Sequence, residues 1–180
     1  MNALWALILA AALPQGATLG VDAKASEVRY TIVHKLHRVE GASRDVEAKA
    51  VVKDDGSVLA MARIPLASFR SGDGNRDEHM LEALEAGKHP FVVFKGTARL
   101  GPGRDVPATL PMAGEVDLHG VATPVTVPLA LAVQPDGSVR ARGSFQVSLD
   151  AHRVERPSLL FVKIDDGCRI DFDLLMRESR

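Results

Sequence analysis

The amino-acid sequence predicts an all-β protein, an antiparallel barrel of about eight strands with one short helix between strands 3 and 4. Two observations and one physical argument predict this class. After residue 22 most of the chain alternates between apolar and polar residues, which is typical of half-buried strands. Residues 54–57 (Asp-Asp-Gly-Ser) and 135–138 (Pro-Asp-Gly-Ser) have the Asp-Gly chemistry of tight hairpin turns. Closing a meander of such strands into a barrel removes its exposed edges.

The expected strands follow one another along the chain, each ending at a turn or a loop. Alternation places every second side chain on one face, so each run offers one apolar face to the interior. The second run is long, and Arg44, Glu47 and Lys49 alternate there with small apolar residues. The expected strands are residues 28–33, 39–52, 58–64, 91–100, 112–118, 125–133, 139–149 and 168–174.

Residues 75–87 interrupt the alternation and predict the helix. Met80, Leu81 and Leu84 recur there at helical spacing. Asp77 is the expected N-cap, and Gly87 is the expected residue that ends the helix. We expect this helix to cover one end of the barrel.

The composition is that of one globular domain, which we place at residues 18–180. Hydrophobic residues make up 46% and charged residues 25%, and 22 Lys+Arg against 23 Asp+Glu leave a net charge of −1. This balance excludes a general electrostatic attraction for nucleic acid. Cys168 is the one cysteine, which excludes an intrachain disulfide. Its thiol could join two chains in a homodimer, but its alternation with Ile170 and Phe172 favours a buried position.

The first segment predicts export. Residues 3–13 are apolar, and no charged side chain precedes Asp22. This run has the length of the apolar core of a signal peptide and is shorter than the roughly 20 residues that span a bilayer. Residues 14–17 (Pro-Gln-Gly-Ala) end the run and offer cleavage after Ala17. We therefore expect residues 1–17 to be a signal peptide and the mature protein to be periplasmic or otherwise exported; the alternative is a buried N-terminal helix.

The expected inward face carries no charge and holds many Gly and Ala side chains. An eight-stranded barrel is just wide enough for side chains to fill it or for one small ligand to enter. Two explanations of the small lining stay open. In the first, a slender apolar ligand fills the remaining space. In the second, Gly and Ala lie at bulges and close strand contacts, or the sheets flatten into a sandwich and the space collapses.

Three segments resemble the YceI-like family, in the order in which that family has them. They are residues 75–80 (Asn-Arg-Asp-Glu-His-Met), 89–95 (His-Pro-Phe-Val-Val-Phe-Lys) and 114–125 (Gly-Glu-Val-Asp-Leu-His-Gly-Val-Ala-Thr-Pro-Val). The similarity extends over nearly all of residues 21–175. The chain departs from the family pattern at residues 84–89 and 149–152, and residues 153–164 resemble a local elaboration.

The resemblance implies a lipocalin-like barrel, exported to the periplasm, that binds a long isoprenoid or other amphiphilic chain in its interior. The bound molecule would be an isoprenoid quinone or a fatty lipid, with no cofactor required and no catalytic activity. It also implies a membrane cytochrome as a candidate partner.

An enzyme that acts on a lipid and a packed structural or interaction module are the competing classes of function. A lipid hydrolase or isomerase would use His79 with Asp77, and a packed interaction module would hold no ligand. His34 and His37 would point to opposite faces of a continuous strand, so we expect no metal site there.

We expect the bound chain to contact nine apolar side chains, and a polar head group to meet Arg76 and His79. An inward bulky residue, as in Ala62→Trp or Gly143→Phe, is expected to block binding more than folding. The nine side chains are Ile64, Phe94, Val116, Leu118, Val127, Phe145, Val147, Ile170 and Phe172.

Overall fold

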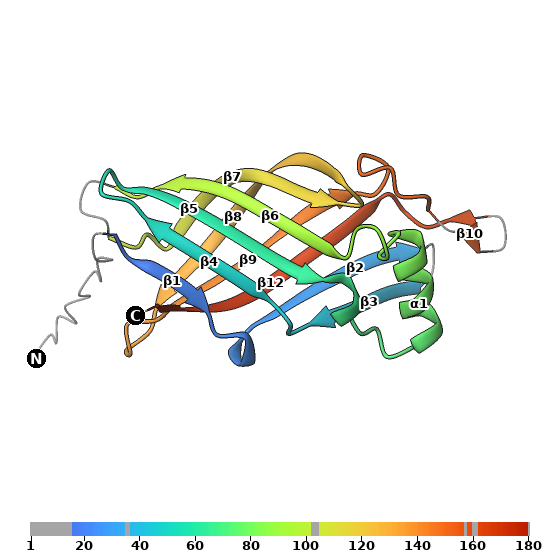
Figure 1. Ribbon diagram of the computed structural model, residues 1–180, viewed down its shortest axis with the longest axis horizontal. Helices are drawn as coiled ribbons and strands as arrows, with labels where there is room; N and C mark the ends of the chain where they lie inside the picture. The colour runs from blue at the N-terminus through green and yellow to red at the C-terminus, as the bar shows by residue number, and fades with distance from the viewer. Residues whose placement is uncertain (1–15, 35–36, 102–104, 157, 160–161, 180) are drawn as a thin grey trace, which may run out of the picture.

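The computed structural model describes residues 16–34, 37–101, 105–156, 158–159 and 162–179 (Figure 1). The predicted signal segment therefore lies outside the described residues except for Gly16 and Ala17. No helix in the described residues is both long and apolar enough to span a membrane.

The chain folds into a closed antiparallel barrel, which confirms the predicted fold class. Eight strands form the ring in the order β1-β4-β5-β6-β7-β8-β9-β12, and β12 pairs back onto β1 to close it. The ring strands are β1 (Thr18–Val21), β4 (Glu47–Val52), β5 (Ser57–Pro65), β6 (Phe91–Arg99), β7 (Thr109–Leu118), β8 (Val121–Val133), β9 (Val139–Ser148) and β12 (Gly167–Glu178).

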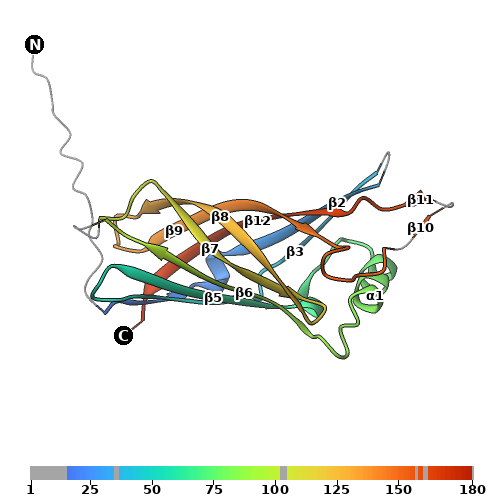
Figure 2. The same cartoon turned by 90° about the horizontal axis from the view of Figure 1, so that it is seen from above.

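Two further strands extend the sheet beyond the ring at one end. β2 (Glu27–His34) pairs with the first half of β12, and β3 (His37–Ser43) pairs with β2. Their hairpin projects from the same end as the short β10 (Ser158–Leu159) and β11 (Val162–Lys163), while the C-terminus lies at the other end (Figure 2). His34 and His37 are ladder partners on the two strands of this hairpin, so they do not lie along one continuous strand.

The predicted strand over residues 39–52 is divided into β3 and β4. Val39, Gly41 and Ser43 are the inward positions of β3, whereas Val46 is buried and Ala48 and Ala50 line the interior from β4. The inward parity therefore changes from odd to even numbers, which one continuous strand cannot do. The side chain of Ser43 stabilises the break: its Oγ accepts from the Asp45 N–H at 3.1 Å and lies 2.6 Å from the Ser68 Oγ.

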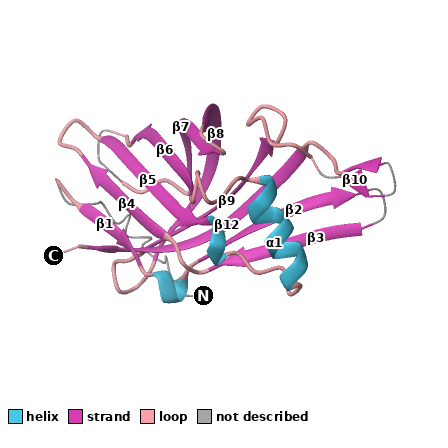
Figure 3. Cartoon of the chain, turned by 45° about the vertical axis from the view of Figure 1, so that its right-hand side comes forward, coloured by secondary structure: helices cyan, strands magenta, loops and turns pink. Residues whose placement is uncertain are grey.

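Helix α1 (Gly74–Ala83) connects β5 to β6, as predicted, and lies at the end of the barrel that carries the β2–β3 hairpin (Figure 3). Its N-cap is Asp73 rather than Asp77, because the Asp73 side chain accepts from the N–H groups of Asn75 and Arg76. The helix also ends before Gly87, since Glu85 takes the left-handed conformation with φ 45°. The one-turn helix η2 (Leu66–Ser68) precedes α1 and buries Leu66.

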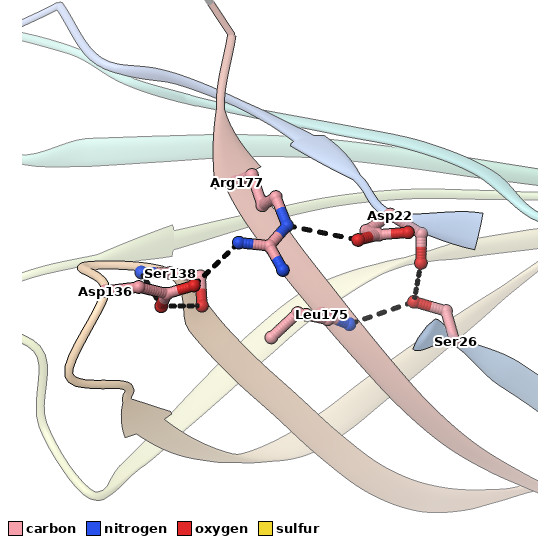
Figure 4. A network of polar contacts seen from close by, with 6 residues as sticks. All are labelled: Asp22, Ser26, Asp136, Ser138, Leu175 and Arg177. Atoms are coloured by element: carbon pink, nitrogen blue, oxygen red, sulfur yellow. Dashed lines mark hydrogen bonds and ion pairs between the residues drawn. The ribbon is translucent and has the colours of Figure 1, made fainter. Parts of the chain in front are cut away.

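The one-turn helix η1 (Ala23–Ala25) separates β1 from β2. Beside it, the hydroxyl of Ser26 forms hydrogen bonds with backbone groups of Asp22 and of Leu175 on β12 (Figure 4). The hydroxyl donates to the Asp22 carbonyl at 2.7 Å and accepts from the buried Leu175 N–H at 2.9 Å. Arg177, two residues after Leu175 on β12, donates to the Asp22 carboxylate at 3.1 Å and to the Asp136 carboxylate at 2.7 Å. These contacts tie β1, β12 and the β8–β9 turn together.

Replacing Ser26 by Ala should lower the free energy of unfolding by about 1–3 kcal/mol, because the buried Leu175 N–H loses its acceptor. Urea unfolding measures the difference. Ser57→Ala is the matched control, since the Ser57 hydroxyl meets only the exposed Asp55. Equal losses in the two variants would show that Ser26 does not carry the ladder across the break.

The acid sensitivity of the fold should depend on Asp136. Hydrogen bonds from the Ser138 hydroxyl and the Arg177 guanidinium lower the pKa of Asp136 from 3.8 to about 2. A carboxylate with a lowered folded pKa stabilises the fold above its unfolded pKa and loses that contribution as the pH falls through the folded value. We expect Asp136→Asn to flatten the decline of the urea midpoint between about pH 4.5 and 2, relative to the wild type. An unchanged slope in Asp136→Asn would contradict this assignment.

Candidate functional site

The interior of the barrel contains one long cavity of about 1050 Å³. Protein interiors rarely leave voids much larger than a water molecule, and a space of this size is typical of a ligand-binding site. Phe94 packs against the buried cluster at the α1 end and also against the one at the other end, which places it midway along the cavity.

All eleven residues singled out from the sequence line this cavity. The nine apolar side chains come from β5, β6, β7, β8, β9 and β12, and Arg76 and His79 come from α1. Alternation found them because a barrel strand shows every second side chain to the interior. Their contact with a ligand stays a prediction.

Aromatic rings lie over two inward glycines of the wall, Gly96 and Gly143. A Cβ at Gly96 would come within 2.5 Å of the Phe94 ring, and one at Gly143 within 2.5 Å of the Phe172 ring. These glycines therefore make room for neighbouring rings, as the close-contact explanation proposed. The sheets have nevertheless not collapsed, and the cavity remains beside those rings.

This packing corrects one sequence-based expectation. A side chain at Gly143 would meet the Phe172 ring and the Pro128 carbonyl oxygen at 2.8 Å, so Gly143→Phe would disturb the wall itself. Ala62 already carries a Cβ, lines the cavity and is the better position for blocking it.

Most of the charged lining of the cavity lies at one end, and Lys49 on β4 is the exception. Helix α1 presents Arg76, His79, Met80 and Ala83, at i, i+3, i+4 and i+7, along one face to the opening. The opposite end is lined by apolar side chains, among them Leu100, Val106, Leu110, Val139 and Met176. An amphiphilic molecule would therefore enter with its apolar chain and leave its polar end near α1.

The loop after β9 forms the other side of the opening, and His152 anchors it. The side chain of His152 is 1% exposed. Its Nδ1 lies 2.8 Å from the Val121 carbonyl oxygen, and its Nε2 lies 2.8 Å from the Thr123 hydroxyl. Because a carbonyl only accepts, Nδ1 carries the proton and Nε2 accepts from Thr123.

Hydrogen bonds from the Arg156 guanidinium hold the same loop in place. Arg156 donates to both carboxylate oxygens of Asp150, at 2.7 and 2.8 Å, and to the Ile164 carbonyl at 2.7 Å. Arg156 and Glu155 both line the cavity, and neither was expected from the sequence. They lie in the segment where the chain departs from the family pattern.

Tyr30 is another cavity residue that the sequence analysis missed. It is 7% exposed, lines the cavity from β2 and makes an edge-to-face contact with Phe69 at 5.5 Å between centroids. Alternation with Val28 and Ile32 was the signal that could have placed it on the inward face.

His79 and Asp77 do not form a catalytic pair. Residues i and i+2 of a helix point in different directions. The Asp77 Oδ1 accepts from the Ser71 N–H at 3.0 Å, and this bond holds the loop before the helix. Within the described part of the chain no group of three or more His, Cys, Asp or Glu side chains could hold a metal ion.

Cys168 lies on the cavity wall and is 7% exposed. Burial raises the pKa of its thiol to about 12, which leaves it protonated and unreactive. This position is the buried one that alternation favoured, and it keeps the thiol away from a second chain.

The fold and this site define a class of protein: a lipocalin-like antiparallel barrel with an apolar internal cavity. The chain belongs to the YceI-like family, whose domain model matches residues 20–176. A comparison with curated protein sequences finds no match.

Solved structures share the fold at low sequence identity. BcnA of Burkholderia cenocepacia is 22% identical, with a TM-score of 0.74 over 86% of this chain and 98% of that one. A polyisoprenoid-binding domain from Saccharophagus degradans, implicated in plant cell wall breakdown, is 17% identical, with a TM-score of 0.70 over 89% and 98%. The YceI protein of Campylobacter jejuni is 14% identical, with a TM-score of 0.62 over 82% and 89%. At these identities the likeness extends to the fold.

Proposed function

We propose that this protein is an exported, non-enzymatic carrier that holds a long isoprenoid chain, such as that of a quinone, or another amphiphilic lipid inside its barrel. The observation that carries the proposal is the cavity of about 1050 Å³, whose lining is mostly apolar and whose charged residues lie mainly on α1 and the loop after β9. The polyisoprenoid-binding neighbour from Saccharophagus degradans supports the same class of ligand.

Burial of the chain supplies the binding energy. Apolar surface removed from water contributes about 25 cal/mol per Å², so each 100 Å² of chain that enters the barrel contributes about 2.5 kcal/mol before the costs of ordering it. Arg76 and His79, both exposed at the opening, are placed to meet the polar end. No reacting group is needed for this function.

Export rests on the first segment of the sequence. Residues 1–17 have the apolar core and small cleavage residue of a signal peptide, and the barrel begins directly afterwards with β1 at Thr18. The periplasm is the compartment that we propose. Cell fractionation with an antibody against the barrel tests it, with a chain lacking residues 2–17 as the control that should stay in the cytoplasm.

We also propose two protein partners, a membrane cytochrome and a second copy of this chain. A membrane cytochrome follows from the family resemblance. A homodimer would need an interface other than a Cys168 cross-link, because that thiol is buried. Sedimentation of the purified protein tests the homodimer.

Retention of a lipid during gel filtration tests the carrier function. We expect the protein to carry a long-tailed ubiquinone through the column at one molecule per chain, measured by the ultraviolet absorbance of the quinone. The His79→Ala variant should still carry the ubiquinone through the column, because burial of the isoprenoid tail supplies the affinity. A lipid-converting enzyme would instead release a changed product from the wild type and none from His79→Ala.

A further inference from the structure

The strongest unexplained feature of the cavity is the hydroxyl group of Tyr30. The ring is 7% exposed, and no described residue forms a hydrogen bond with its hydroxyl. Every side-chain nitrogen or oxygen that protein atoms fully enclose in the described part does have a partner. The Tyr30 hydroxyl therefore still borders open space, and that space is the cavity that the ring lines.

The position of this ring is fixed by its neighbours. Tyr30 is the ladder partner of Gly41 on β3, and a Cβ at Gly41 would overlap both the ring and its hydroxyl oxygen. The ring therefore lies across the bare backbone of Gly41, while Phe69 packs edge-on against it. A buried polar group is costly unless it is paired, so a ring held this firmly in an apolar wall needs a partner from elsewhere.

The hydroxyl is a donor at every physiological pH. Burial raises the pKa of Tyr30 to about 12, and the nearby Asp77 carboxylate adds to the rise while Arg76 opposes it. Tyr30 belongs to the same buried cluster as Phe69 and Leu84, and Met80 of α1 packs against that cluster, so the phenol lies at the α1 end of the cavity.

We propose that Tyr30 donates a hydrogen bond to a neutral acceptor oxygen, such as a quinone or amide carbonyl, on the polar end of the bound amphiphile. This inference rests on the proposed carrier function and adds the chemical class of the head group.

Two probes separate the roles of tail and head. A long-tailed ubiquinone offers carbonyl oxygens, whereas squalene offers an isoprenoid chain without any head. We expect Tyr30→Phe to bind the ubiquinone about 3- to 10-fold more weakly than the wild type, the size of one hydrogen bond. Its affinity for squalene should stay within about twofold of the wild-type value. Both affinities are measured by displacement of a fluorescent fatty-acid probe.

Ile32→Val is the matched control. Ile32 is the next inward residue of β2 and lines the cavity, but it carries no polar atom. It should change the affinities for both probes by the same factor. Equal ubiquinone affinities of Tyr30→Phe and the wild type would overturn the inference and leave the carrier function standing, whereas a wild type that binds neither probe would overturn both.

Stability and spectroscopy test the assignment independently. Because the hydroxyl has no partner in the protein, Tyr30→Phe should unfold at the wild-type temperature or above it when no ligand is present. Tyr30 is the one tyrosine of the chain. The intensity ratio of its Raman ring doublet, which depends on hydrogen bonding of the phenol, should change with ubiquinone and stay unchanged with squalene. A destabilised Tyr30→Phe with an unchanged doublet would mean that the hydroxyl has only a structural role.

Discussion

Ala62→Trp should weaken the binding of a long-tailed ubiquinone by at least about 100-fold, equal to about 2.8 kcal/mol, and leave the barrel folded. Ala62 lines the cavity from β5 and is the ladder partner of Phe94, the residue midway along it. An indole at this position would occupy the path of the chain and remove the apolar contacts that stabilise it. The unfolding temperature should not fall, because filling a void does not cost stability when no contact is lost.

Leu59→Trp is the matched control for this experiment. Leu59 lies on the same strand with its side chain 39% exposed, and it does not line the cavity. It should bind the quinone as the wild type does. Normal binding by a folded Ala62→Trp would show that the chain is held somewhere other than in the barrel.

His152→Ala should be the most damaging single change to stability outside the strands. It removes a fully buried ring together with its bonds to Val121 and Thr123, and we expect a loss of about 2–4 kcal/mol in the free energy of unfolding. The loop that bears Glu155 and Arg156 would lose its anchor, so amide exchange in residues 149–156 should also accelerate.

Thr123→Val gives the control, since it removes one of the two bonds and keeps the imidazole. It should cost about 1 kcal/mol. If His152→Ala is no less stable than Thr123→Val, the buried ring does not hold the loop, and the opening of the cavity must be shaped by other contacts.

The strands that line the cavity were predictable because their signal is local. Alternation identifies the inward residues of β5 to β9 directly, and it identified Ile64, Phe94 and Val147 as lining residues. The same rule would have divided the run of residues 39–52, since a change of parity between Ser43 and Val46 requires a break. Alternation did not predict the short β1, because only four residues form this strand.

The long-range contacts of the opening could not be read from the sequence. His152 meets partners 31 and 29 residues away, and nothing in its own segment indicates a buried ring. The helix start was misplaced because Asp73 and Asp77 are both plausible caps in sequence. The structure decides for Asp73, whose side chain accepts from Asn75 and Arg76, while Asp77 accepts from Ser71.

Native mass spectrometry of the purified, exported protein, followed by organic extraction, tests the central claim most directly. The account predicts a mass above that of the chain alone, and the released molecule should be a long-chain isoprenoid or other amphiphile bound once per barrel. A homogeneous mass of the chain alone, both as purified and after incubation with a long-tailed ubiquinone, would contradict the carrier function and leave the likeness to polyisoprenoid-binding domains as one of fold.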